Sequence, residues 1–85
     1  MAEEQKKTYS VKVFSTSSCP WCTRVKQYLD FNDIKYQDIN IERDQQAGIE
    51  MVRKSGQQGV PQLWINGQVV VGFNKPMIDR LLDLG

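Results

Sequence analysis

Both cysteines of this 85-residue chain lie within one tetrapeptide, Cys19-Pro20-Trp21-Cys22, which limits the folds open to it. The tetrapeptide follows Val11-Lys12-Val13-Phe14, a short apolar segment typical of a buried strand, and opens a stretch with helical spacing. A C-x-x-C pair at a strand-to-helix junction places two sulfurs on one side of the first helical turn, where they can bond to each other. Such a pair can give up or take up two electrons.

The two cysteines are predicted to have unequal surroundings. Proline is favoured at the first helical position, which makes Cys19 the N-cap and places the backbone amides of Trp21 and Cys22 near its sulfur. The positive end of the helix then favours a thiolate at Cys19, which is expected to be exposed. Cys22 is expected to be shielded and to react second. Helical spacing puts Cys22, Val25, Tyr28 and Leu29 on the inward side, and Arg24, Lys26 and Gln27 on the outward side.

Besides a redox role, three roles are open to the cysteine pair. A structural disulfide across so short a loop would contribute only about 2 kcal/mol to stability. A structural zinc site normally needs four ligands, and the chain has no histidine and no further cysteine. Two buried cysteines acting as small apolar side chains would not account for the Pro-Trp between them. A redox-active pair is therefore the favoured interpretation.

Composition restricts the partners and the location. A chain of 85 residues forms one domain, expected over residues 9–85 after a flexible tail at residues 1–8. Its net charge of +1 provides no field for attracting nucleic acid or an anionic membrane, so neither is expected as a partner. The sequence shows no signal-like segment and no run long enough to cross a bilayer, which predicts a cytoplasmic protein. In that reducing compartment a lone C-x-x-C is more often catalytic or metal-binding than structural.

Hydrophobic periodicity predicts four strands and three helices in the order β-α-β-α-β-β-α. Strands are expected at residues 9–15, 35–41, 62–65 and 68–71, and helices from residue 20, at 43–55 and at about 76–84. Two successive β-α units imply that the first two strands are parallel, and Asn66-Gly67 predicts an antiparallel hairpin. Gly56 and Asn74 are expected to cap helices. Apolar runs in the last two strands imply a sheet covered by helices on both faces.

Residues 9–85 resemble a glutaredoxin. The resemblance is carried by C-P-W-C after the first strand, Val60-Pro61 before the third, the Asn66-Gly67 hairpin, and Gly72-Phe73 before the last helix. It implies an α/β, thioredoxin-like fold with a four-stranded mixed sheet flanked by three helices. It also implies that Cys19 is the nucleophile and Cys22 the resolving thiol, and that Pro61 is a cis proline facing them. The expected substrate-binding residues are Pro20, Trp21, Val60, Pro61, Gly72 and Phe73.

The chain departs from ordinary glutaredoxins at four positions of the glutathione site. Thr16 stands where those proteins usually have a lysine, and Gly59 where they have a threonine. In the family's Gly-Gly-x-Asp-Asp segment, Val71 replaces a glycine and Lys75 replaces an acid. In this respect the chain is more similar to glutaredoxin-like redoxins that take electrons from thioredoxin reductase.

The resemblance therefore implies a monomeric dithiol–disulfide oxidoreductase that reduces protein disulfides and holds no bound cofactor. Its electrons are expected from a thioredoxin-reductase-type flavoprotein. One alternative is an ordinary glutaredoxin that uses glutathione as co-substrate for deglutathionylation. Another, of a different class, is a dimer that binds an iron–sulfur cluster through the exposed cysteine and glutathione.

Overall fold

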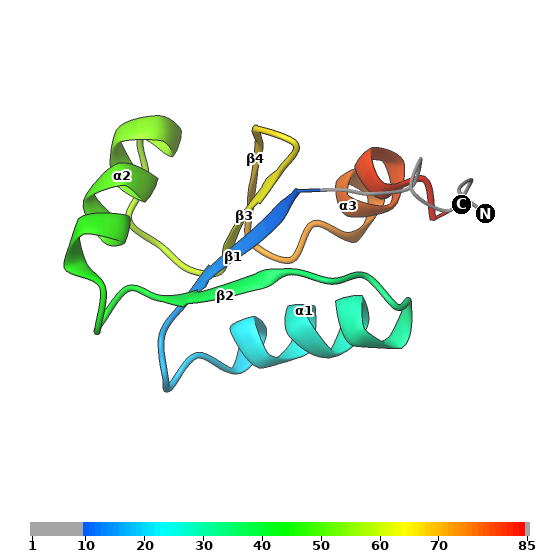
Figure 1. The fold of residues 1–85 in the computed structure, drawn as a ribbon, viewed down its shortest axis with the longest axis horizontal. Helices are drawn as coiled ribbons and strands as arrows, with labels where there is room; N and C mark the ends of the chain where they lie inside the picture. Colours follow the sequence, from blue (N-terminus) through cyan, green and yellow to red (C-terminus); the bar gives the residue numbers. More distant parts are fainter. Residues whose placement is uncertain (1–9, 85) are drawn as a thin grey trace.

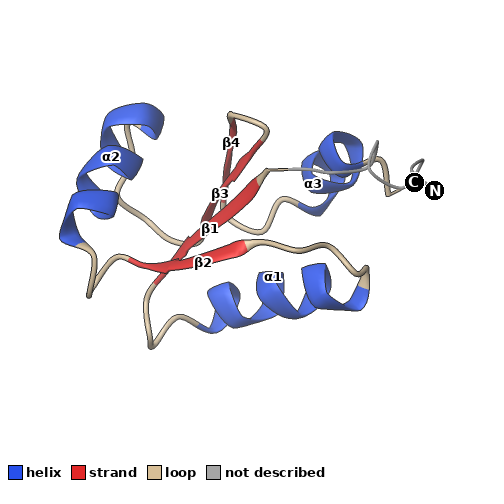
Figure 2. Ribbon diagram, viewed as in Figure 1, coloured by secondary structure: helices blue, strands red, loops and turns tan. Residues whose placement is uncertain are grey.

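A four-stranded mixed sheet forms the middle layer of the protein, with helices on both faces (Figures 1 and 2). The computed structural model describes residues 10–84. The predicted order of elements is confirmed, whereas the predicted tail at residues 1–8 lies outside the described residues. The elements are β1 (Val11–Ser15), α1 (Pro20–Phe31), β2 (Gln37–Asn40), α2 (Gln45–Ser55), β3 (Gln62–Ile65), β4 (Gln68–Val71) and α3 (Lys75–Leu82).

The strands are arranged in the order β2-β1-β3-β4. As predicted, β1 is parallel to β2, with Val13 opposite Asp38, and β3 and β4 form an antiparallel hairpin. β3 is also antiparallel to β1, with Leu63 opposite Val13. The carboxyl ends of the parallel strands β1 and β2 meet at one edge of the sheet, and the loop that leads to the cysteines leaves from this edge.

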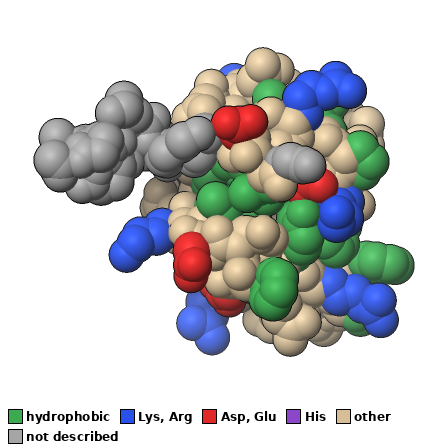
Figure 3. Space-filling model, turned by 90° about the vertical axis from the view of Figure 1, so that its right-hand side faces the viewer, with side chains coloured by type: hydrophobic (Ala, Val, Ile, Leu, Met, Phe, Trp, Pro, Cys, Tyr) green, Lys and Arg blue, Asp and Glu red, His purple; other side chains and the backbone are tan. Residues whose placement is uncertain are grey.

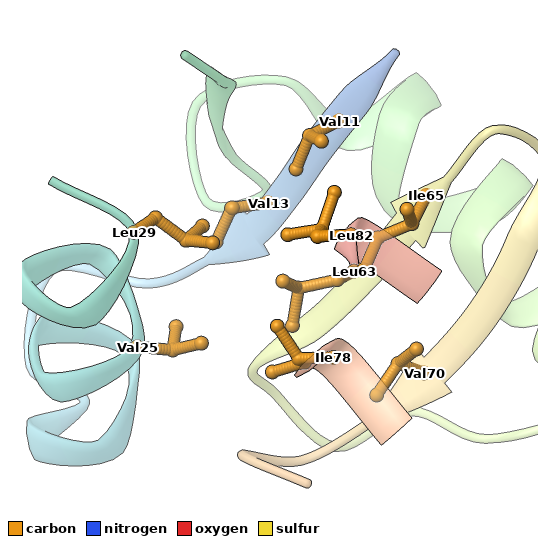
Figure 4. Packing of buried hydrophobic residues seen from close by; sticks show 9 residues of the cluster. All are labelled: Val11, Val13, Val25, Leu29, Leu63, Ile65, Val70, Ile78 and Leu82. Atoms are coloured by element: carbon orange, nitrogen blue, oxygen red, sulfur yellow. The ribbon is translucent and has the colours of Figure 1, made fainter. Parts of the chain in front are cut away.

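The helices divide between the two faces of the sheet, α1 and α3 on one face and α2 on the other (Figure 1). Figure 4 shows that side chains from α1 and α3 point toward those of the strands. On the opposite face Phe14 packs against Trp64, with ring centroids 4.6 Å apart, and α2 contributes the buried Met51. The alternation of side chains along β1 therefore supplies both layers. The cluster beneath α1 and α3 comprises Val11, Val13, Val25, Leu29, Leu63, Ile65, Val70, Ile78 and Leu82.

The segment between β2 and α2 is longer than predicted because side chains close it at both ends. The Asn40 side chain accepts a hydrogen bond from the amide of Glu42 at 2.8 Å, which starts a turn. The Asp44 side chain accepts a hydrogen bond from the amide of Ala47 at 3.1 Å and caps α2. β2 therefore ends before residue 41, and α2 begins after residue 43.

The other predicted helix caps are confirmed. Gly56 follows α2 in the left-handed conformation, with φ 77°, and the side chain of Asn74 caps α3. α3 ends at Leu82 rather than at residue 84, because Asp83 adopts a left-handed conformation with φ 60°. This helix is short, but its cap fixes where the preceding loop, with Gly72 and Phe73, meets it.

Figure 3 shows one face of the molecule, on which basic and acidic side chains lie among one another. This mixing agrees with the net charge of +1, and the described residues show no patch of one sign on this face such as binds nucleic acid. Within residues 10–84, every helix falls short of the length and apolar character that crossing a bilayer would need.

Candidate active site

Cys19 occupies the N-cap of α1, as predicted, and Pro20 takes the first helical position. The Cys19 Sγ accepts a hydrogen bond from the amide of Cys22 at 3.2 Å. The thiol in turn donates to the carbonyl of Val60 at 3.8 Å. Cys19 is half-buried, not exposed as the sequence predicted. The helix N-terminus and the Cys22 amide both favour negative charge on this sulfur.

Cys22 lies on the inward side of α1 and is only 1% exposed. Burial raises the pKa of its thiol from 9.0 to about 12, and the hydrogen bond with Cys19 adds to the rise. The backbone amide of Thr16 and the charge of Lys26 act in the opposite direction. At neutral pH the buried member is therefore a neutral thiol.

This inequality predicts selective alkylation of the reduced protein. Iodoacetamide at neutral pH should label Cys19 and leave Cys22 unmodified, because the thiolate is the reactive form and the raised pKa keeps Cys22 protonated. Labelling of Cys22 should increase only as the pH approaches its raised pKa of about 12. Mass mapping of peptides measures both sites, and protein unfolded in urea, in which both should react, is the control. Equal labelling in the folded protein at neutral pH would contradict the assignment.

The loop before Cys19 is tied to the far end of β2. The amide of Ser17 donates to the Glu42 carboxylate at 3.2 Å, and the Asn40 side chain donates to the Ser17 hydroxyl at 3.0 Å. The amide of Ile41 donates to the Ser15 carbonyl at 3.0 Å, continuing the pairing of the two strands. These bonds fix the position at which α1 begins, and with it the position of the Cys19 sulfur.

A groove of about 310 Å³ is lined by Trp21, Val60, Pro61, Gly72 and Phe73. These five residues come from the first turn of α1, the segment before β3 and the segment after β4. The Val60–Pro61 peptide bond is cis, as predicted. The amide of Gly72 donates to the carbonyl of Pro61 at 2.8 Å, which joins two sides of the groove.

Pro20 is the one predicted substrate residue that does not line this groove. It is exposed at the first helical position and its contribution is to the helix start. Trp21 is 56% exposed, and the Arg24 guanidinium lies 4.9 Å from the centroid of its ring. The Phe73 ring packs against Tyr28 at 5.5 Å. The groove thus has two aromatic walls, each supported by a side chain of α1.

Larger hollows in residues 10–84 lie away from the cysteine pair. A larger hollow of about 610 Å³ lies along α2, between Ile41 and Met51, and contains neither cysteine. No group of three or more His, Cys, Asp or Glu side chains in this part of the chain is placed to hold a metal ion. The thiols and their groove are therefore the place where chemistry is concentrated.

Lys75, which replaces an acid of the family's pattern, is paired within the protein. Its Nζ lies 3.1 Å from the Asp79 carboxylate and 5.2 Å from the centroid of the Tyr28 ring. The Tyr28 hydroxyl also donates to Asp79, and this bond lowers the pKa of the Asp79 carboxyl. The start of α3 therefore presents a cation beside the groove, with its neighbouring acid already engaged.

Lys26 does not face outward as predicted, and its side chain is only 23% exposed. Its Nζ lies 3.0 Å from the Asp38 carboxylate and 3.4 Å from the hydroxyl of Ser15, which is 2% exposed. Lys26 lies four residues after the inward-facing Cys22, and residues four apart share a helix face. This spacing was the sequence signal that could have placed Lys26 on the inward side.

Comparison with known sequences and structures agrees with this geometry. The Glutaredoxin family model matches residues 11–70. A glutaredoxin-like 8.6 kDa protein from the rubredoxin operon of Clostridium pasteurianum is 42% identical over 73 residues, which cover 86% of this chain and 97% of that protein. Glutaredoxin 3 of Escherichia coli K12 is 30% identical over 63 residues, covering 74% of this chain and 76% of that protein.

Solved structures lead to the same family. The thioredoxin-like protein BC3987 matches with a TM-score of 0.79 and 26% identity, covering 85% of this chain and 99% of that one. A buckwheat glutaredoxin, solved as a complex with glutathione, matches with a TM-score of 0.71 and 28% identity, covering 92% of this chain and 74% of that one. The predicted thioredoxin-like fold is confirmed. The chain therefore belongs to the glutaredoxin family, whose members are thiol–disulfide oxidoreductases.

Proposed function

We propose that this chain reduces disulfide bonds in partner proteins, with Cys19 as the nucleophile and Cys22 as the resolving thiol. The observation that carries the proposal is the pairing of an accessible sulfur with a buried one. Cys19 caps α1 and accepts the hydrogen bond of the Cys22 amide at 3.2 Å, whereas the Cys22 side chain is 1% exposed. A substrate disulfide can therefore approach only the first sulfur.

The reaction proceeds in two exchanges that balance in atoms and electrons. The Cys19 thiolate attacks one sulfur of the substrate disulfide, forms a mixed disulfide and releases the other sulfur as a thiolate, which takes a proton from water. Cys22 then loses its proton and attacks Cys19, so that the Cys19–Cys22 bond forms and the bond to the substrate breaks. The substrate leaves with two thiols, and the protein has lost two electrons.

The groove is proposed to hold the segment of the partner that carries its disulfide. Trp21 and Phe73 offer apolar walls, and Gly72 carries no side chain between them. In the reduced protein the Val60 carbonyl accepts the hydrogen of the Cys19 thiol. When Cys19 ionises, this carbonyl becomes free to accept a backbone amide of the bound segment instead.

For the return of electrons we propose a thioredoxin-reductase-type flavoprotein, with glutathione as the alternative. The glutaredoxin family uses glutathione, and the buckwheat relative was solved in complex with it. A glutathione site needs an acid for the α-amino group and cations for the carboxylates. Here Lys75 stands where ordinary glutaredoxins have an acid, and it is paired with Asp79. The change removes an expected partner of the α-amino group of glutathione, and it therefore supports a flavoprotein as the electron source. We also propose that the chain acts as a monomer in the cytoplasm, where reductases keep thiols reduced.

Reduction of insulin tests the proposed activity independently of the natural reductant. With dithiothreitol as the electron source, the chain should accelerate the precipitation of the insulin B chain in proportion to its concentration. Protein whose Cys19 has been alkylated beforehand is the matched control and should give the uncatalysed rate. An uncatalysed rate with the unmodified, reduced protein would contradict the proposal.

A further inference from the structure

Lys26 is tied to the sheet beside the buried member of the cysteine pair. It lies one helical turn after Cys22 on α1, and its ammonium contacts Asp38 of β2 at 3.0 Å and Ser15 of β1 at 3.4 Å. The Ser15 hydroxyl also donates to Asp38 at 3.1 Å. Three elements of the fold therefore hold the Lys26–Asp38 ion pair on the side of the helix that carries Cys22.

The groups that act on Cys22 change when the mixed disulfide forms. In the free chain, burial and the interactions with Cys19 raise the pKa of Cys22, while the Thr16 amide and the Lys26 charge lower it. In the mixed disulfide the Cys19 sulfur is bonded to the substrate and carries neither a proton nor a charge. Lys26, whose charge lowers the pKa of Cys22, still carries that charge at the step where Cys22 must ionise.

We propose that Lys26, held by Asp38 and Ser15, is a positioning residue for the second exchange, in which its ammonium stabilises the thiolate of Cys22. In this step Cys22 gives its proton to water, its sulfur bonds to Cys19, and the substrate sulfur departs as a thiolate that is protonated by water. Lys26 keeps its own proton throughout. The inference rests on the proposed two-step function, and it concerns only the second step.

The expected effect follows from two opposing contributions. Removing the Lys26 charge should raise the pKa of Cys22 further, which lowers the fraction of Cys22 thiolate at neutral pH. A more basic thiolate is also a better nucleophile, with a Brønsted coefficient of about 0.4–0.5, which returns part of the loss. Because this coefficient is below one, the loss of thiolate outweighs the gain in nucleophilicity, and the net result is a slower second exchange.

Rapid-mixing kinetics of Lys26→Met, Lys26→Arg and Lys35→Met would test this proposal. Lys26→Met should slow release of the reduced substrate from the mixed disulfide. Lys26→Arg, which keeps the charge, should restore most of the rate. Lys35→Met, which removes a lysine from the segment between α1 and β2, should leave the rate unchanged. The first exchange, measured in a Cys22→Ser background, should be the same with and without Lys26. Lys26→Gln replaces Lys26→Met if the latter does not fold.

Titration of Cys22 provides a readout that a merely structural role would not change. In Cys19→Ser protein, Cys22 is the only cysteine, and ¹³C NMR of its β-carbon should show a higher pKa when Lys26→Met is added. Unchanged titration and an unchanged second exchange would overturn the role of Lys26 while leaving the two-step function intact. Absence of any mixed disulfide in Cys22→Ser protein would instead reject the proposed function.

Discussion

Replacing Cys19 by serine should lower disulfide-reducing turnover by more than about 10³-fold, the scale on which removal of a nucleophile is felt. The serine hydroxyl is not ionised at neutral pH, and Cys22 cannot take over because it is 1% exposed. Insulin reduction with dithiothreitol measures the loss against the uncatalysed rate. Because Ser at an N-cap is favourable, the free energy of unfolding should be nearly unchanged, which separates lost chemistry from lost folding.

Replacing Cys22 by serine should have a different outcome. The protein should release one substrate thiol per molecule in a rapid burst and then stall as a mixed disulfide, because no second thiol attacks Cys19. A burst in the Cys19→Ser protein, with none in the Cys22→Ser protein, would reverse the assigned roles. The two variants therefore act as controls for each other.

Turnover driven by glutathione and its reductase should be at least about tenfold slower than turnover driven by a thioredoxin-reductase-type flavoprotein. Each charged hydrogen bond to glutathione is worth about 1.5–3 kcal/mol, and losing two weakens binding by more than about tenfold. The residues at positions 16, 59, 71 and 75 differ from those expected in ordinary glutaredoxins, and Lys75 is already paired with Asp79. The two electron sources can be compared in parallel assays with the same disulfide substrate. Equal rates would return the chain to the ordinary glutaredoxins.

A reversal at one of these positions should recover part of the activity with glutathione. Lys75→Asp should lower the KM for glutathione by about tenfold, since it restores an acid for the α-amino group. Lys35→Asp, which makes the same charge change elsewhere, should have no such effect. If both variants respond equally, net charge rather than the position of Lys75 would account for the preference.

The sequence predicted the fold well because its local signals agree with one another. The Asn66-Gly67 turn, the left-handed Gly56 and the Asn74 cap all occur where the residue types require them. Element ends were less predictable, because they depend on hydrogen bonds across the chain. β2 ends earlier and α2 begins later than predicted, because the side chains of Asn40 and Asp44 accept hydrogen bonds from backbone amides there. Sequence periodicity does not reveal these hydrogen bonds.

The reactive pair could also be placed from the sequence, because a proline and a helix start define the N-cap. The groove was less accessible to such reasoning, since its walls come from three segments and Pro20 proved to lie outside its lining. Helical spacing alone places Lys26 on the outward side of α1, whereas the structure has it mostly buried. Its actual partners, Ser15 and Asp38, come from two strands, and only the folded sheet brings them within reach of one ammonium.

Peptide mapping of a trapped complex tests the roles of the two cysteines most directly. Cys22→Ser and Cys19→Ser proteins are each mixed with a disulfide-bonded peptide, quenched with acid, digested without reductant and analysed by mass spectrometry, alongside wild-type protein oxidised by the same peptide. We expect a single adduct in which the peptide is bonded to Cys19, and a Cys19–Cys22 disulfide in the wild-type protein. An adduct on Cys22 in Cys19→Ser protein, or no covalent adduct in Cys22→Ser protein, would contradict these roles.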